Sequence, residues 1–290
     1  MDEALRISFP RQATIAYIDS FLKAVRAVLD ATNQRVCFDL SRIVEVSSVL
    51  ICFLSGLLDL SRAKNNKVDI VLPRNKRAAK AIRSVKELSR RKDALIRITE
   101  RICQVRKITG NNNAAIEEIL SLLRENIKMG PSAYDSLLVV LTELLTNAID
   151  HSGEKSCYVC AGAWGRSKYL HVTLLDFGMG IPQKIRTRYP EYEDDVEAVK
   201  SLLRLGLTTR VGLEGGRGYR FIQEILRRNE GRLHIFSGKT KTVLKYDKGE
   251  YNYRTARRAF TGTCVDIQFN LEEQGFDALV EEMEESPFIL

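Results

Sequence analysis

The segment Tyr169–Pro182, YLHVTLLDFGMGIP, constrains the fold of this chain more than any other stretch. Its first half is rich in aliphatic residues, which is typical of a buried strand. The strand ends at Asp176, and glycines follow at positions 178 and 180. These glycines allow the backbone to approach a flat ligand closely, and the carboxylate can accept a hydrogen bond from an exocyclic amine. The segment therefore predicts a sheet strand that runs into a ligand-binding turn.

A leucine-rich segment earlier in the chain, Leu141–Ser152 (LTELLTNAIDHS), predicts a helix with a polar stripe. Glu143, Asn147 and Asp150 are spaced i, i+4 and i+7, which places them within about 60° of one another on a helix. The opposite side is apolar and predicts the core face, at positions 141, 144, 145 and 148. By itself, such a stripe also fits an ordinary solvated helix face.

A third segment, Leu205–Leu226, contains a glycine-rich turn that opens a helix. Glycines at this place expose backbone N–H groups at a positive helix terminus, which favours a phosphate. Two threonines and an arginine shortly before the turn add hydroxyl and cationic donors. The spacing matches neither the P-loop nor the dinucleotide-binding motif.

In this order, ELLTNAIDH, DFGMGIP and GLTTR…GGRGYRFI resemble the nucleotide-binding motifs of the GHKL superfamily, the Bergerat-fold ATP-binding domains of gyrase and histidine kinases. The resemblance covers about residues 95 to 270 and includes the closing segments GRLHIFSG and FTGTCVDIQF. It implies an α/β sandwich in which helices cover one face of a mixed sheet. It also implies ATP and Mg²⁺ as cofactors.

The resemblance assigns a role to residues in each motif. Asn147 is the implied ligand of Mg²⁺, Glu143 the general base that polarises a water or a hydroxyl, and Asp150 a supporting residue near adenine or metal. Asp176 is implied to bind the adenine amino group, in a pocket that includes Gly178, Met179 and Gly180. The remaining implied ATP-binding residues are Thr208, Thr209, Gly215, Gly216, Arg217, Gly218 and Tyr219.

Two members of this superfamily fit less well. Histidine kinases need a phospho-accepting histidine on an upstream helix, and the histidines here are at positions 151, 171 and 234. Gyrase-type enzymes complete catalysis with a cation from a following domain. The candidates for that role here, for which simple solvation is the alternative, are Lys184, Arg186, Arg188, Arg210 and Arg217.

The first ninety residues alternate strand and helix patterns, which predicts a small α/β domain. The segment Cys37–Pro73 resembles STAS-like domains of the anti-sigma-factor antagonist type, with a strand, a serine pair, a helix over 49–63 and another strand. In that family a serine near the start of the helix can be phosphorylated, and Ser47 and Ser48 match its place. The alternative is that one of these serines caps the helix.

We therefore expect a STAS-like domain over residues 1–93 and a GHKL-type domain over residues 94–290. Residues 61–110 hold sixteen Lys and Arg against four acidic residues, whereas the tail from Glu272 is acidic. A basic segment can attract nucleic acid. This one lacks the aromatic residues that stack on bases, so a solvated face or an acidic protein partner is favoured.

Composition favours a cytoplasmic chain without a membrane anchor. No apolar run reaches the roughly 18 residues of a membrane span, and the start, MDEALRISFP, is unlike a signal peptide. Six scattered cysteines indicate reduced thiols. Cys157 and Cys160 have metal-ligand spacing, but residues three apart on a strand face opposite sides, so a zinc site is not expected.

The implied function is a Mg-ATP-dependent regulator, a GHKL-type ATPase whose lid closure controls a partner such as a STAS-domain or toxin-like effector protein. A serine/threonine kinase of the anti-sigma-factor type, acting on a STAS-domain partner, is one alternative. A non-catalytic ATP sensor that contacts nucleic acid through residues 61–110 is another. All three share one site, and they differ in whether Glu143 activates a water, a serine or nothing. The sequence leaves the oligomeric state open.

Overall fold

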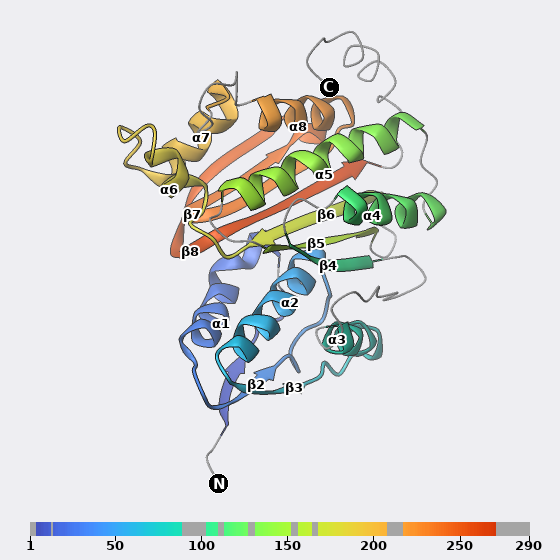
Figure 1. Cartoon of the computed structure of the whole chain (residues 1–290), viewed down its shortest axis with the longest axis vertical. Coiled ribbons are helices and arrows are strands. Elements are labelled where there is room, and N and C mark those ends of the chain that lie inside the picture. The colour runs from blue at the N-terminus through green and yellow to red at the C-terminus, as the bar shows by residue number, and fades with distance from the viewer. Residues whose placement is uncertain are drawn as a thin grey trace.

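The structure is a computed structural model that describes the chain over residues 4–12, 14–88, 103–109, 113–126, 131–151, 156–163, 168–207 and 217–270. Within these ranges the chain is an α/β protein with two sheets that lie on either side of a helix layer (Figure 1). The order of layers is a small sheet, the helices α1 and α2, a large sheet and an outer group of helices.

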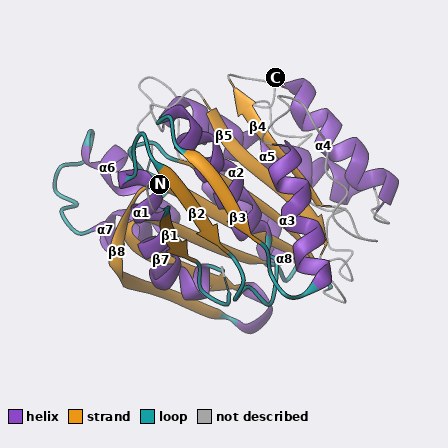
Figure 2. Ribbon diagram, turned by 90° about the horizontal axis from the view of Figure 1, so that it is seen from below, coloured by secondary structure: helices purple, strands orange, loops and turns teal. Residues whose placement is uncertain are grey.

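The small sheet is parallel and has the order β1-β2-β3. One of its faces packs against helices, and Figure 2 views the sheet from the other side. The alternation of strands and helices predicted for this part of the chain is confirmed. Its elements are β1 (Leu5–Ser8), the 3-10 turn η1 (Ile15–Tyr17), α1 (Ile18–Asp30), β2 (Arg35–Asp39), α2 (Ser48–Ala63), β3 (Lys67–Val71) and α3 (Lys76–Leu88).

The large sheet has the order β4-β5-β6-β8-β7, and every pair of neighbours is antiparallel. The expected mixed sheet is wrong in this respect. Two helices lie between β4 and β5, and the chain returns to the sheet in the opposite direction. The strands β6 and β7 run the same way, but β8 lies between them. The strands are β4 (Cys103–Thr109), β5 (Ser156–Ala163), β6 (Tyr169–Asp176), β7 (Arg232–Lys245) and β8 (Glu250–Asn270), with the turn η2 (Tyr246–Lys248) between the last two.

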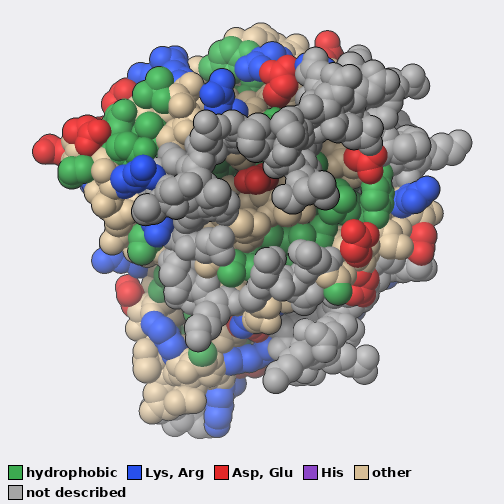
Figure 3. All heavy atoms as spheres, turned by 45° about the horizontal axis from the view of Figure 1, so that its top comes forward, with side chains coloured by type: hydrophobic (Ala, Val, Ile, Leu, Met, Phe, Trp, Pro, Cys, Tyr) green, Lys and Arg blue, Asp and Glu red, His purple; other side chains and the backbone are tan. Residues whose placement is uncertain are grey.

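The outer helices bury their apolar faces against the large sheet. Leu141, Leu144 and Leu145 lie in this core together with Ala148, so the predicted core face of the leucine-rich helix is confirmed. Figure 3 shows this side of the molecule, where acidic side chains lie among hydrophobic ones. The helices are α4 (Asn113–Asn126), α5 (Pro131–His151), α6 (Ile181–Arg186), α7 (Asp195–Leu205) and α8 (Arg217–Arg228).

The opposite face of the large sheet is covered by α2, which shares an apolar cluster with it. Phe21 and Phe53 from the N-terminal helices join Tyr158, Phe236 and Phe260 from the sheet in this cluster. Helices therefore cover both faces of the large sheet, whereas the sequence predicts one covered face. The predicted domain boundary near residue 93 lies outside the described residues.

The two serines at the start of α2 have different environments. Ser47 caps the helix, because its Oγ accepts a hydrogen bond from the backbone N–H of Leu50 at 3.1 Å. Ser48 is only 1% exposed and donates to Asp266 Oδ1 at 3.3 Å. The capping interpretation is confirmed for Ser47. A phosphoryl group on Ser48 would enter a buried site beside a carboxylate, so α2 would first have to separate from the sheet.

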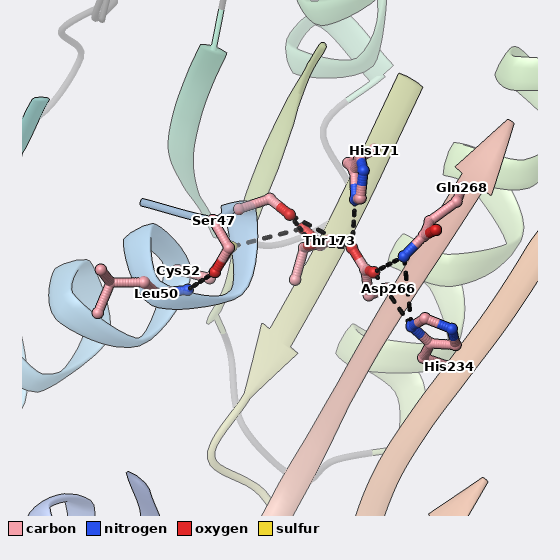
Figure 4. A network of polar contacts seen from close by, with 9 residues as sticks. Ser47, Leu50, Cys52, His171, Thr173, His234, Asp266 and Gln268 are labelled. Carbon is pink, nitrogen blue, oxygen red and sulfur yellow. Dashed lines mark hydrogen bonds and ion pairs between the residues drawn. The ribbon is translucent and has the colours of Figure 1, made fainter. Parts of the chain in front are cut away.

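Asp266 is the centre of a buried polar network between α2 and the large sheet (Figure 4). Its carboxylate accepts hydrogen bonds from Thr173 Oγ1 at 2.7 Å and Gln268 Nε2 at 2.9 Å. The Nδ1 atoms of His171 and His234 lie 3.5 and 3.4 Å from its two oxygens. Burial raises the pKa of Asp266, but the two histidines outweigh burial and hold that pKa below its usual value.

Replacement of Asp266 by Ala should lower the free energy of unfolding by about 3 kcal/mol, because the buried donors around it lose their common acceptor. Urea unfolding at neutral pH measures this change. The matched control is Asp69→Ala, which removes an exposed ion pair with Arg35 and should have a much smaller effect. Equal effects of the two substitutions would contradict a central role for the network.

The same carboxylate predicts a pH dependence. Because the pKa of Asp266 is lowered on folding, its contribution is complete above its pKa in the unfolded chain, about 4, and is lost as the pH falls further. We expect urea unfolding below about pH 4 to show a smaller loss of stability in Asp266→Asn than in the unaltered chain. If the free energy of unfolding fell equally with pH in the two proteins, this assignment would be contradicted.

Candidate functional site

The helix α5 places the polar stripe of the first motif beside the core. Glu143 and Asn147 are half-buried, and the leucines of the same helix fill the apolar cluster below them. Asp150 belongs to α5, but its side chain lies outside the described part of the structure. Two of the three residues of the predicted stripe therefore have described positions on one helix.

The second motif forms a tight turn at the end of β6. Asp176 is 3% exposed, and its Oδ1 accepts a hydrogen bond from the backbone N–H of Gly178 at 2.9 Å. Met179 is half-buried beside this turn. Gly180 has a φ of +80°, and a Cβ there would lie 2.8 Å from Ser237 Oγ and 2.9 Å from the carbonyl oxygen of Gly262. The turn therefore requires glycine at position 180.

The third motif touches the first at the start of α8. The backbone of Gly218 lies so close to Glu143 that a Cβ at position 218 would overlap the carboxylate Oε2 and lie 2.9 Å from Cδ. The first turn of α8 carries the positive end of the helix dipole, which favours a negative charge at this place. Glycine is needed here because it leaves room for an acidic group against the helix terminus.

Tyr219 joins all three motifs. Its side chain is buried, and its pKa is raised by burial first and then by the negative charges of Asp176 and Glu143. The hydroxyl therefore stays protonated and can act as a hydrogen-bond donor. Burial and the charge of Asp176 also raise the pKa of Cys157, which lies on the neighbouring strand β5. Glu143 of the first motif therefore lies against Gly218 of the third, and Asp176 of the second is near enough to Tyr219 to raise its pKa.

Several predicted residues lie outside the part of the chain that the structure describes. Thr208, Thr209, Gly215 and Gly216 lie outside the described residues, as does Arg210. Arg217 begins α8, but its side chain is likewise outside the description.

Two of the candidate cations between the second and third motifs have structural contacts. Arg186 Nη1 lies 2.9 Å from Asp195 Oδ1 and also donates to backbone carbonyls. The guanidinium of Arg188 lies 5.7 Å from the ring centroid of Tyr189. Lys184 is half-buried on α6. Arg186 therefore connects α6 to α7.

Sequence reasoning missed two polar residues behind the turn. Thr263 on β8 pairs directly with Asp176 on β6, so their side chains share a face of the sheet. Ser237 accepts a hydrogen bond from the N–H of Ile181 at 2.8 Å and donates to the carbonyl of Gly262 at 2.8 Å. The Gly-Thr pair within FTGTCVDIQF is the signal for Thr263, because Gly262 allows β8 to approach the backbone of Asp176.

The described residues contain no cluster of three or more His, Cys, Asp or Glu with the geometry of a metal site. Cys157 and Cys160 belong to the apolar clusters on opposite faces of the large sheet, as their strand spacing predicts. Any metal near α5 would therefore rely on ligands other than such a cluster.

Neither a comparison with protein-family models nor a search of curated proteins finds a match for this chain. Among the helices of the described residues, none has the length and apolar composition of a membrane span.

The contact between Glu143 and Gly218 predicts a strongly non-additive pair of substitutions. Gly218→Ala should lower the free energy of unfolding by about 1–3 kcal/mol, because the new methyl group displaces the Glu143 carboxylate. In a Glu143→Ala background the same change should be neutral or stabilise by up to about 1 kcal/mol, since alanine favours a helix.

Urea unfolding of the four proteins gives the coupling energy directly. Equal effects of Gly218→Ala in the two backgrounds would show that the two residues are not in contact.

Proposed function

We propose that this chain binds Mg-ATP as a GHKL-type ATPase and regulates a partner protein through its nucleotide state. The observation that carries the proposal is the meeting of the three motifs around Glu143, Asp176 and Gly218. Glu143, Asp176 and Gly218 are each more than thirty positions apart in the sequence, yet they lie in one part of the fold. A solvated helix face and an ordinary hairpin turn would have no reason to meet there.

The residues around Glu143, Asp176 and Gly218 suit the phosphates, the adenine amine and the Mg²⁺ of Mg-ATP. The N-terminal turn of α8 is fit for phosphate, because the helix dipole is positive there and Gly218 adds no side chain beside the Glu143 carboxylate. The carboxylate of Asp176 is fit for the exocyclic amine of adenine, with Thr263 beside it on the same sheet face. Asn147 would supply an amide oxygen to Mg²⁺, which commonly combines few protein ligands with phosphate oxygens and waters.

Glu143 has the position of a general base. Its carboxylate lies against the turn at which the phosphates would bind. In hydrolysis, Glu143 would accept a proton from the water whose oxygen attacks the γ-phosphorus, and ADP would leave with the electrons of the broken P–O bond. With a serine hydroxyl in place of water, the same step would phosphorylate a protein.

The regulatory part of the proposal rests on the N-terminal part of the chain. A small α/β unit that packs on the back of the nucleotide-binding sheet can report the nucleotide state to a partner. STAS-domain and toxin-like effector proteins are the partner classes that the resemblance implies. We place the protein in the cytoplasm, where buried thiols such as Cys52 and Cys264 remain reduced.

Incubation of the purified chain with Mg²⁺ and γ-labelled ATP tests this function. We expect free phosphate to be released, and Glu143→Gln to reduce the rate roughly 100-fold or more through loss of the base. Asp176→Asn should weaken ATP binding, measured by calorimetry, roughly 10- to 100-fold, because a charged acceptor for the adenine amine is lost. The matched control is Glu224→Gln, which alters a surface carboxylate on α8 that pairs with Arg228.

The outcomes separate the candidate functions. Label on a serine of an added STAS-domain protein, instead of free phosphate, would assign the kinase function. Binding of ATP without either product would assign a sensor. Normal ATP affinity in a folded Asp176→Asn variant would contradict the proposed site.

A further inference from the structure

The residue between Asp176 and Gly178 attaches the nucleotide turn to the N-terminal part of the chain. Phe177 is partly buried and packs against the apolar cluster around α2. Its ring centroid lies 6.3 Å from that of Phe53, with the two rings perpendicular at 90°. It also meets Tyr158 at 6.2 Å and Phe260 at 5.8 Å, again nearly edge-on. Such edge-to-face pairs hold a ring in a defined position.

Successive residues at the end of β6 thus have contacts on different sides of the sheet. Asp176 lies close to Cys157 and Tyr219, which belong to the cluster below α5 and α8. Phe177 lies in the cluster that contains α2. A displacement of the ring on one side must therefore move the carboxylate on the other.

The ring of Phe177 packs against Gly56 on α2. A Cβ at position 56 would overlap Cε2 of Phe177, and it would lie 2.9 Å from Cζ and 3.2 Å from Cε2 of Tyr158. The ring therefore lies directly on the bare backbone of the helix. No side chain other than hydrogen fits without movement of the ring.

The local backbone of α2 gives no other reason for a glycine at this position. Gly56 lies in the middle of the helix and is not among the residues with a positive φ. A glycine in a helix interior costs about 1 kcal/mol relative to alanine. The contact with Phe177 is the feature of the fold that requires it.

We propose that α2 is part of the nucleotide site, and that Gly56 and Phe177 are positioning residues which set the place of Asp176 and therefore the affinity for adenine. The hydrogen bond from the N–H of Gly178 to Asp176 Oδ1 closes the turn around Phe177, so the three residues move as one unit. This inference rests on the proposed function. It gives the N-terminal part of the chain a direct means of controlling nucleotide binding, because any movement of α2 moves the backbone against which the Phe177 ring packs.

The test compares ATP with inorganic tripolyphosphate as calorimetric probes of the full chain in Mg²⁺. Gly56→Ala should weaken ATP binding roughly tenfold, as expected for directly coupled neighbours. It should leave tripolyphosphate binding unchanged, because the phosphates bind at α8 and the displaced carboxylate recognises only adenine. A general loss of structure would instead weaken both probes together.

Two further variants are the controls. Ser55→Ala changes the preceding position of α2 by a single oxygen and should alter neither affinity. Phe177→Leu replaces the ring that meets position 56 by a smaller aliphatic side chain. Gly56→Ala should therefore reduce ATP affinity much less in the Phe177→Leu background than in the unaltered chain. This non-additivity identifies the contact even where each single variant loses some stability.

The results distinguish this inference from the function on which it rests. Failure of the unaltered chain to bind ATP overturns both. Binding of ATP by the unaltered chain with the same affinity in Gly56→Ala overturns the inference alone. Equal losses for ATP and tripolyphosphate also overturn it, because they show a general structural effect and no selective movement of Asp176.

Discussion

The packing of α2 between the two sheets is the interaction on which the rest of the structure depends. A helix that is buried on one side carries a single apolar stripe, whereas α2 is apolar almost all around. This composition follows from the position of α2 between the sheets, since one side packs against the small parallel sheet and the other against the large antiparallel sheet. The polar network around Asp266 at the N-terminus of α2 then fixes how the helix lies on the large sheet. A purely apolar contact would tolerate sliding, but hydrogen bonds to a buried carboxylate do not.

The large sheet lies between two apolar clusters, one on each of its faces. Residues that are neighbours on one strand pack in different clusters, because successive side chains face opposite sides. Cys157 and Cys160, three positions apart on β5, lie in opposite apolar clusters, and Asp176 at the end of β6 faces the other side from the following residue Phe177. The site on the outer side is therefore mechanically joined to the N-terminal part on the inner side. A shared core of this kind makes coupling between the two sides a matter of side-chain packing, without a flexible linker.

Much of the local structure could be predicted from sequence because it depends on neighbours along the chain. The apolar periodicity of α5 predicts which of its faces is buried, and the serine pair predicts the cap of α2. The order of the three motifs indicates one site even though each motif alone is weak. The pairing of the strands in the large sheet was not accessible in this way, since it depends on how the connecting elements cross the sheet and not on neighbours along the chain. Thr263 was also missed, because its proximity to Asp176 is a matter of strand register.

The sequence by itself predicted the alternating strands and helices of the N-terminal part, the buried face of α5 and the capping of α2. These properties follow from backbone propensity, side-chain periodicity and functional groups, all of which act over a few residues. Only the tertiary structure decided that Gly218 lies against Glu143, that Gly56 packs against Phe177 and that α2 packs against two sheets. Each of these contacts joins residues that are far apart in the chain. Their geometry follows from the packing of whole elements, which no local pattern of residues records.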